Sequence, residues 1–520
     1  MCETRAGRRR VMMIGLDGSE PTIADALAAA GRLPAHARLQ QEAAHCALDH
    51  GGARRTGLAW EHVATGLDPD SAERWAAVDF DAATYEVRQR STNLAPFIAG
   101  LDARTVVVDP PYFDLPRTKA RGLVGWGAHD PGVPTCAQPA EFLEEARERF
   151  GDYCAGPWIY GFVWPSEEKA RAMAEALPRA VDQRAALAEW TFAERFPDWE
   201  IGLVVVSEYH SAIEALWHGI DPTHPLHGLP SSGAAKAGVE GVYEAGDRLI
   251  GTLMEAFPDA AFVVFNLHGM GPNNSDNASM VLLPELMYRR AFGRPLMPER
   301  TWPTTAGGVP LLRQDQLWRR EVARLFDEAD PMSALSNAAH RAFKAKKSKP
   351  AGQPSLSWMP ATRYQKFWPR MRAFALPSFY DGRIRINVKG REAQGLVDAA
   401  DYDAECEAII AMLRTCRDPI SGELAVDRVE KRAGDPMTAR ESEADLVVTW
   451  TMAPPLGLQH PELGVMGPLP YRRTGGHTGG PGFAYFHGAG IAPRDLGARS
   501  AFDVVPTVLD LLNAGRPQRL

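Results

Sequence analysis

The sequence predicts an α/β fold, a doubly wound and mostly parallel central sheet with helices on both faces. Short apolar runs alternate along the chain with longer amphipathic stretches, which is the order of strands and helices in such a fold. The apolar runs are nearly continuous, as expected for strands that are buried on both faces. Polar residues next to glycines follow several of these runs, at the points where the strands would end.

The expected strands are short and mainly apolar. Pro110 and Pro111 stop the second of them, because proline cannot donate to a strand ladder. In chain order we expect strands at Val11–Leu16, Thr105–Val108, Ile201–Val206, 261–265 and 445–449.

The expected helices lie between these runs. Gly31 closes the first, and the capping signal Ser166-Glu-Glu opens the second. We expect helices at 20–30, 166 to about 194, 211–217, 235–257 and 502–512.

One long segment breaks the alternation. Residues 296–395 carry several prolines and tryptophans, and a basic run at 344–349 that is expected to be a solvated loop. We therefore predict a hydrolase core of residues 1–295 and 396–520, with 296–395 as an insertion or cap.

Composition excludes several classes of protein. The chain has 520 residues, 45% of them hydrophobic and 23% charged, which is ordinary for a globular protein. A net charge of −8 offers no basic field for a nucleic acid polymer or a membrane. Val11–Leu16 is too short for a signal-peptide core or a membrane span. The six cysteines lack C-x-x-C spacing and fit a reduced, cytoplasmic protein. Nothing in the sequence indicates the oligomeric state.

Two polar residues early in the chain are candidates for phosphate chemistry. Asp17 follows the first strand and precedes Gly18, which suits a cation ligand, although an Asp-Gly pair there is also a common turn. Thr56 precedes a short helical stretch at 57–66, whose free N–H groups would favour an alkoxide and an incoming phosphoryl group. The same threonine also fits an ordinary helix N-cap.

Four of the 14 histidines lie between residues 210 and 227. His210 and Glu214 lie one turn apart on a helix, the spacing of a metal-ligand pair. The other three, His218, His224 and His227, are expected to be loop or surface residues.

Two further histidines complete the candidate site. His268 follows the strand at 261–265 and is either a ligand or a hydrogen-bonded core residue. His477 lies between glycine pairs that permit close backbone approach to a ligand. Because the carboxyl ends of parallel strands meet at one edge of a sheet, these residues predict one metal-dependent site for phosphate-ester chemistry. Its members are Asp17, Thr56, His210, Glu214, His268 and His477.

Taken in this order, the motifs resemble the alkaline phosphatase superfamily, specifically its type I phosphodiesterase/nucleotide pyrophosphatase branch. The resemblance covers most of the chain. It rests on Gly15-Leu-Asp17-Gly18, the interval from Thr56 to Thr65-Gly66, Trp217 ahead of Asp221-Pro-Thr-His224-Pro, His268-Gly269, the segments 382–392 and 503–512, and His477.

The resemblance implies a site with two divalent metals, usually zinc, with manganese as an alternative. It implies that Thr56 is the nucleophile and that a covalent phospho-enzyme forms and is cleared by water. One metal would be held by His210, Glu214 and His477. The implied substrate is a small phosphorylated molecule such as a diester, nucleotide or sugar phosphate.

This sequence departs from the family pattern in two places. Where the family has Asp, three residues and then His, this chain has His210 and Glu214, and Glu208 is a candidate substitute ligand. Where the family has Asp-His-Gly, this chain has Leu267 before His268, and a leucine cannot bind metal.

The second departure affects the second metal. That ion would keep only Asp17, Thr56 and His268, unless Asn266 or Asp276 contributes. We therefore expect one tightly bound metal and a weaker second one.

These features favour a metal-dependent phosphoester hydrolase of the phosphodiesterase or phosphatase type. One alternative is a catalytically altered or non-catalytic member that binds a phosphorylated small molecule, which Leu267 keeps open. Another is a transferase or sulfatase-like activity on the same fold, although no cysteine here has the C/S-x-P-x-R context of sulfatases. The insertion and the segment 125–130, which contains His129 and Asp130, are expected to determine the substrate.

Overall fold

The computed structural model describes residues 9–160, 165–329, 356–453 and 455–514. The chain forms two compact units, the first made of Met1–Glu73, Ser91–Gly271 and His477–Leu520, and the second of Arg74–Arg90 and Pro272–Gly476. The segment predicted as an insertion, 296–395, falls within the second unit, which also takes in 74–90, 272–295 and 396–476. The basic run at 344–349 lies outside the described residues.

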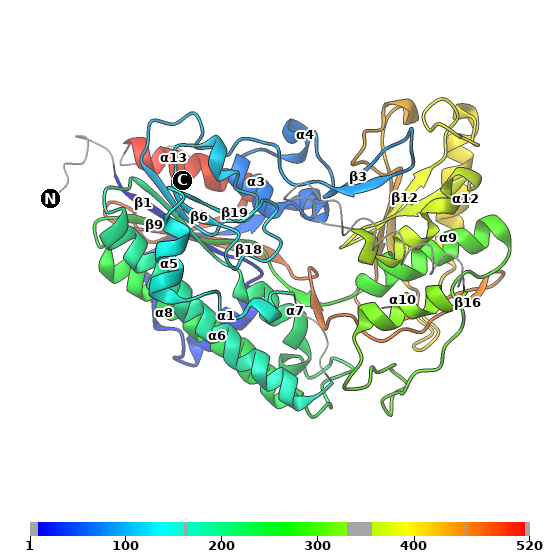
Figure 1. Cartoon of the computed structure of the whole chain (residues 1–520), viewed down its shortest axis with the longest axis horizontal. Helices are drawn as coiled ribbons and strands as arrows, with labels where there is room; N and C mark the ends of the chain where they lie inside the picture. Colours follow the sequence, from blue (N-terminus) through cyan, green and yellow to red (C-terminus); the bar gives the residue numbers. More distant parts are fainter. Residues whose placement is uncertain (1–8, 161–164, 330–355, 454, 515–520) are drawn as a thin grey trace. The chain divides into compact units, whose positions relative to one another are not determined.

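Nine strands of the described residues form one sheet in the first unit (Figure 1). Five neighbouring strands run parallel, and an antiparallel strand borders them on each side. The order across the sheet is β19 (Arg494–Ser500), β2 (Ala44–Asp49), β18 (Pro481–His487), β9 (Ala261–His268), β1 (Val11–Leu16), β8 (Ile201–Val206), β5 (Thr105–Val108), β6 (Arg121–Val124) and β7 (Cys136–Gln138).

The centre of this sheet confirms the predicted fold class. β1 pairs in parallel with both β8 and β9, and all six of its residues are buried. An uninterrupted apolar run is stable there because both faces of the strand are covered.

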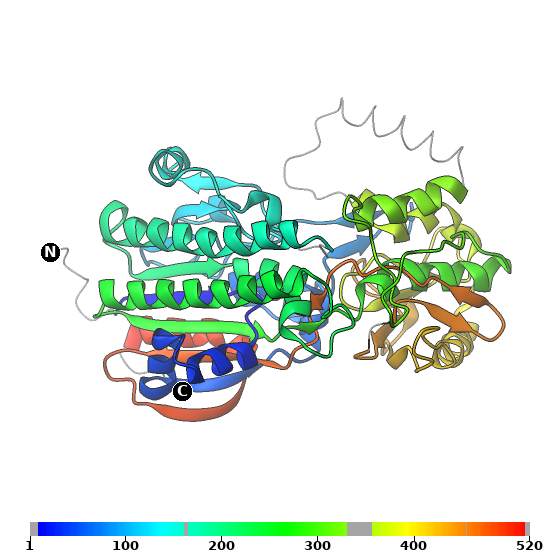
Figure 2. The same ribbon diagram turned by 90° about the horizontal axis from the view of Figure 1, so that it is seen from below.

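Helices cover both faces of the sheet (Figures 1 and 2). The long helices α6 (Glu167–Trp190) and α8 (Ser232–Ala256) lie side by side on one face, with α7 (Glu208–Ile220) packed against α8. On the other face lie α3 (Ala59–Thr65) and α13 (Val504–Ala514).

The Ser166 side chain caps α6 as predicted, by accepting from the N–H of Lys169. The predicted extension of that helix to about 194 is a π-helical turn at Thr191–Arg195. The other helices of the first unit are α1 (Pro21–Ala29), α2 (Pro34–Glu42), α4 (Pro69–Ala72) and α5 (Phe142–Phe150).

The second unit is built on a four-stranded antiparallel sheet. Its order is β11 (Ala373–Leu376), β12 (Gly382–Ile386), β14 (Leu446–Trp450) and β13 (Val426–Lys431). The strand predicted at 445–449 is therefore real but belongs to this sheet. The unit also contains α9 (Leu283–Phe292), α10 (Trp318–Ala329), α12 (Tyr402–Arg414), and the short strands β3 (Val78–Phe80), β4 (Val87–Gln89), β15 (Leu458–His460) and β16 (Gly464–Met466).

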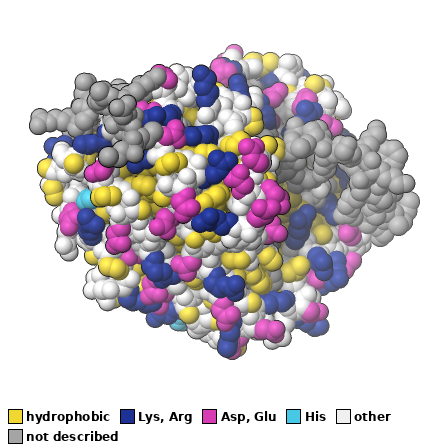
Figure 3. All heavy atoms as spheres, turned by 60° about the vertical axis from the view of Figure 1, so that its left-hand side comes forward, with side chains coloured by type: hydrophobic (Ala, Val, Ile, Leu, Met, Phe, Trp, Pro, Cys, Tyr) yellow, Lys and Arg dark blue, Asp and Glu magenta, His cyan; other side chains and the backbone are white. Residues whose placement is uncertain are grey.

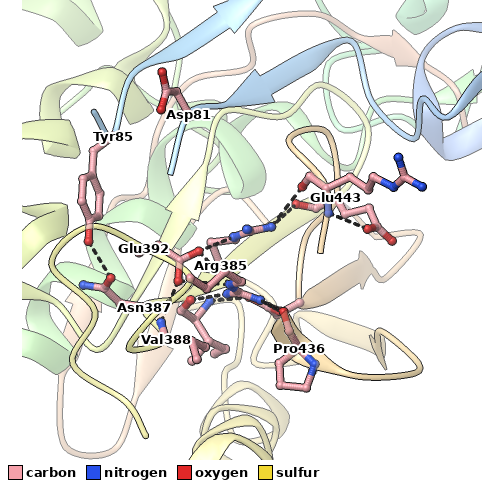
Figure 4. A network of polar contacts seen from close by, with 12 residues as sticks. Asp81, Tyr85, Arg385, Asn387, Val388, Glu392, Pro436 and Glu443 are labelled. Carbon is pink, nitrogen blue, oxygen red and sulfur yellow. Dashed lines mark hydrogen bonds and ion pairs between the residues drawn. The ribbon is translucent and has the colours of Figure 1, made fainter. Parts of the chain in front are cut away.

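The motif at 382–392 forms part of the interior of the second unit (Figure 4). Arg385 Nε lies 2.9 Å from Glu392 Oε1, and both side chains are buried. Arg391 pairs with Asp445 at 2.7 Å, and Tyr85 donates its hydroxyl to Asn387. These ion pairs and this hydrogen bond link the motif to other parts of the same unit.

Charges of both signs are interspersed over the face drawn in Figure 3. No helix in the described part of the chain is both long and apolar enough to cross a bilayer. The cysteines in that part, Cys46, Cys136, Cys154, Cys406 and Cys416, are free thiols.

Candidate metal centre

The candidate site lies at the edge of the large sheet where the parallel strands end. Asp17 directly follows β1, α7 begins just after β8, and His268 is the last residue of β9. β18 runs the other way and pairs Pro481 with His268, so the segment before it, with His477, reaches the same edge. The topology therefore gathers residues that lie far apart in the sequence, as expected.

Asp17 and His210 are in contact across this edge. Gly18 has a φ of +76°, and a Cβ there would lie 2.7 Å from the His210 Cα, so the turn after Asp17 requires glycine. Nδ1 of His210 lies 3.2 Å from Oδ2 of Asp17. Burial alone would raise the pKa of Asp17, but the His210 and His129 imidazoles and a Trp60 hydrogen bond outweigh it, and that pKa lies below its usual range.

His210, Glu214 and His477 form a buried or half-buried group of ligand atoms. Nε2 of His210 lies 3.2 Å from Oε1 of Glu214, one helical turn along α7. The His210 and His477 ring centroids are 4.9 Å apart. Each of the three residues offers a ligand atom within 4.8 Å of the other two. The structure thus brings together the three residues that the resemblance assigned to one metal.

His129 joins this cluster, although its segment was predicted to determine the substrate and not to bind metal. Its ring stacks on that of His210 at 3.8 Å, and its Nε2 lies 3.2 Å from Oε2 of Glu214. A second group of ligand atoms within 4.8 Å of one another is Asp17, His129 and His210. The signal in the sequence is the position of His129 after β6, but this strand has only four residues and was not predicted.

His268 lies beside this cluster. Among the described residues, it belongs to neither of the two groups of possible ligands. Its ring centroid is 5.0 Å from that of His477. Burial lowers the pKa of His268 to about 4, so its imidazole is neutral near pH 7.

Leu267 lines a small cavity together with Val63 of α3 and Val505 of α13. His50 and His62 line the same cavity, and their rings form a buried pair with Nε2 of His50 3.0 Å from Nδ1 of His62. The position at which the family pattern has a carboxylate therefore faces this small cavity.

Thr56 ends a 3₁₀ turn, Gly51–Thr56, that follows β2. Its hydroxyl donates to the carbonyl of Ala53 at 2.8 Å and accepts from the N–H of Leu58 at 3.1 Å. Thr56 is therefore not the N-cap of α3, whose cap residue is Leu58. Arg54 of the same turn donates to the carbonyl of Gly479 at 2.6 Å, which ties the turn to the segment that carries His477.

That glycine-rich segment packs against protein. A Cβ on Gly479 would lie 2.2 Å from the carbonyl carbon of Gly269, so glycine is needed for the two segments to approach. The glycines near His477 were expected to allow approach to a ligand. Gly479 instead brings the His477 segment beside the His268 turn.

Three residues considered as substitute ligands have structural partners. Both Glu208 oxygens lie 3.2 Å from Nε of the buried Arg184. Asn266 accepts from the N–H of Phe483 at 2.8 Å. Asp276, in the second unit, pairs with Arg472 and Arg473 at 2.8 and 2.7 Å.

The prediction of loop or surface positions is wrong for His218, which is buried in α7 with its Nε2 3.1 Å from the hydroxyl of Ser231. His224 and His227 lie in the loop after α7 as predicted, although His224 is buried there. α7 is covered along most of its length, so same-face spacing did not separate ligands from core histidines.

The residues present fit a divalent metal. Imidazole nitrogens and carboxylate oxygens are the ligands that Zn²⁺ and Mn²⁺ accept. The buried Nε2 of His210 has no hydrogen-bond partner despite its 3.2 Å separation from Glu214. A buried polar atom in this state is rare, and a ligand role accounts for it.

No known family model and no curated protein sequence matches this chain. Among solved structures, it is similar to phosphonoacetate hydrolase from Sinorhizobium meliloti 1021 in complex with phosphonoformate, with 15% identity, a TM-score of 0.50, and coverage of 96% of this chain and 94% of that one. It is also similar to wild-type alkaline phosphatase PafA, with 11% identity, a TM-score of 0.52, and coverage of 98% and 96%. These similarities show that the chain has the alkaline phosphatase-like fold that the sequence predicted.

Proposed function

We propose that this protein is a metal-dependent phosphoester hydrolase, of the phosphodiesterase or phosphatase type, that acts on a small phosphorylated molecule. The observation that supports this most is the buried group of His210, Glu214 and His477 at the carboxyl edge of the sheet, with Asp17 beside it. The two solved structures named above are hydrolases of a phosphonate and of phosphate esters by their names, and they share this fold.

His210, Glu214 and His477 would hold a divalent ion, with zinc as the first candidate and manganese as the second. Such an ion, when bound, stabilises negative charge on phosphoryl oxygens. Because the pKa of Asp17 is low, its carboxylate is ionised at neutral pH and can only accept hydrogen bonds. Nδ1 of His210 then donates to Asp17, which leaves Nε2 as the nitrogen available to a metal.

We assign the nucleophile to Thr56. Its hydroxyl would form a bond to phosphorus while the bond to the leaving alcohol breaks, and water would then release phosphate or a phosphate monoester from the threonine. Thr56 is buried, and its turn is bonded through Arg54 to the segment that carries His477. The carbonyl of Ala53, which now accepts from the hydroxyl, fixes its orientation in the resting enzyme.

Turnover of chromogenic phosphate monoesters, phosphate diesters, phosphonates and sulfate esters by metal-loaded protein tests the proposal. Thr56→Ala should reduce turnover of the best substrate by several orders of magnitude, and Thr56→Ser should retain part of it. Thr65→Ala is the matched control, because Thr65 donates to Glu61 and accepts from Leu67 N–H in the same pattern. Near-normal turnover in Thr56→Ala would reject the nucleophile. Binding of a phosphorylated ligand without any turnover would favour the non-catalytic alternative that Leu267 keeps open.

A further inference from the structure

The loop that carries His129 is fixed at its base by Asp109. Asp109 follows β5 and has a φ of +59°, a conformation that costs free energy for a residue other than glycine. In that conformation its two carboxylate oxygens accept from the N–H groups of Trp126 and Gly127 at 2.9 and 2.7 Å. The strained residue thus orders the turn that leads into His129.

A buried arginine joins this loop to the helix that carries the other ligands. Arg184 of α6 is fully buried and lies 2.8 Å from Asp109 and 2.9 Å from Glu208, the first residue of α7. It also donates to the carbonyl of Gly127 at 3.3 Å. Buried ion networks are costly and are weak evidence for stability. Here the network fixes the position of the His129 loop relative to His210 on α7.

The result is a buried side chain placed among metal ligands. His129 stacks on His210, lies 3.2 Å from Glu214, and forms a group of ligand atoms with Asp17 and His210. Asn266 and Asp276, the two candidates for the ligand that Leu267 cannot provide, are bonded to Phe483 and to Arg473.

We propose that His129 is a metal ligand of this centre and that it compensates for the carboxylate missing at Leu267. This inference rests on the metal centre of the proposed function and extends it. The second ion would then be held by Asp17 and His129, on the α7 side of the cluster, instead of by Asp17, Thr56 and His268. The competing explanation is that His129 only forms a hydrogen bond with Glu214. The two explanations predict different metal affinities when glutamine replaces His129.

Binding of Zn²⁺ and Co²⁺ to metal-free protein, measured by calorimetry and by the visible spectrum of the cobalt form, separates them. His129→Ala should weaken binding of the second ion, the one that Asp17 and His129 would hold, by roughly 100-fold or more, beyond the 10–100-fold typical of an outer hydrogen-bond partner. His129→Gln keeps an N–H that can donate to Glu214 but is a poor ligand, so it should lose as much affinity as His129→Ala and change the cobalt spectrum. His45→Gln, a partly exposed histidine on β2, is the matched control and should bind as the wild type does.

An affinity for the second ion close to wild type in His129→Gln would overturn the ligand role. A measurement on the wild type guards against misfolded variants: anomalous scattering from zinc-soaked crystals should place an ion about 2.0–2.1 Å from a His129 nitrogen. An ion beyond about 3 Å from both nitrogens, or no ion at all, would also overturn it. Because these experiments use no substrate, a wild type that hydrolyses no ester but binds metal through His129 would reject only the proposed function.

Discussion

Replacing Arg184 with methionine should destabilise the protein by about 3–5 kcal/mol. Arg184 is fully buried and pairs with two buried carboxylates, Asp109 and Glu208. Methionine fills much of the same volume but leaves both carboxylates without their cation. Removal of one partner of a buried pair typically costs about 3–5 kcal/mol, because the charge that remains is desolvated and unpaired.

The matched control is Arg248→Met, which removes another arginine paired through two nitrogens with a carboxylate. Arg248 and Asp182 lie 2.8 Å apart, but their side chains are 56% and 50% exposed. Exposed pairs of this kind contribute roughly 0–1 kcal/mol. The destabilisation by Arg184→Lys should lie between those two values, since lysine keeps the charge and loses the planar fork of donors.

Urea unfolding followed by circular dichroism measures the difference. With a slope of about 3 kcal/mol per molar urea, the expected loss lowers the midpoint for Arg184→Met by about 1–1.7 M. A midpoint for Arg184→Met within about 0.3 M of the Arg248→Met midpoint would refute the reasoning. It would mean that Asp109 and Glu208 find other partners or water when the arginine is absent.

Three further outcomes are expected. Removing metal with a chelator should lower the unfolding midpoint, and zinc at 100 times its dissociation constant should restore about 2.7 kcal/mol; a midpoint insensitive to both would argue against a metal centre. Leu267→Asp should raise the bound metal per chain toward two in elemental analysis, and an unchanged content would show that position 267 does not limit the second site. Burial lowers the pKa of His218 to about 4, so the unfolded chain takes up its proton first as pH falls. The contribution of His218 to stability should therefore be constant above about pH 6.5 and decrease by roughly 3 kcal/mol toward pH 4, and His218→Gln should remove that part of the pH dependence in urea unfolding at pH 7 and 4.5.

Most of the sheet centre could be predicted because buried parallel strands have a simple sequence signature. Val11–Leu16, Thr105–Val108 and Ile201–Val206 have the limits that the apolar runs indicated. The outer strands lack that signature. β19 is Arg-Asp-Leu-Gly-Ala-Arg-Ser and largely exposed, so its sequence does not differ from that of a loop. The strand at 445–449 looked like its neighbours in sequence, and nothing local indicated that it belongs to another sheet.

The candidate site could be predicted where a ligand follows a recognisable strand. Asp17 and the pair on α7 follow β1 and β8, and they are in contact as expected. His129 was missed because β6 contains one arginine and one glycine in four residues. The role of Glu208 was also hidden, since its partner Arg184 is 24 residues away and a single sequence carries no sign of that ion pair.

Leu267 shows how this chain departs from a two-metal pattern in physical terms. Leu267 is buried and lines a cavity with Val63 and Val505, and full burial of a leucine stabilises a protein by roughly 1.5–3 kcal/mol. A carboxylate at that position would lose this stabilisation and would need a cation to offset its burial.

The number of possible ligands predicts how many ions the proposed centre would bind tightly. The cluster offers five side chains, Asp17, His129, His210, Glu214 and His477. A catalytic zinc ion typically uses three protein ligands and leaves a fourth position open to water or substrate. Five side chains complete one such set and leave two ligands for a second ion. That ion is therefore expected to bind weakly, and to be retained best when the oxygens of a phosphorylated substrate supply the ligands that the protein lacks.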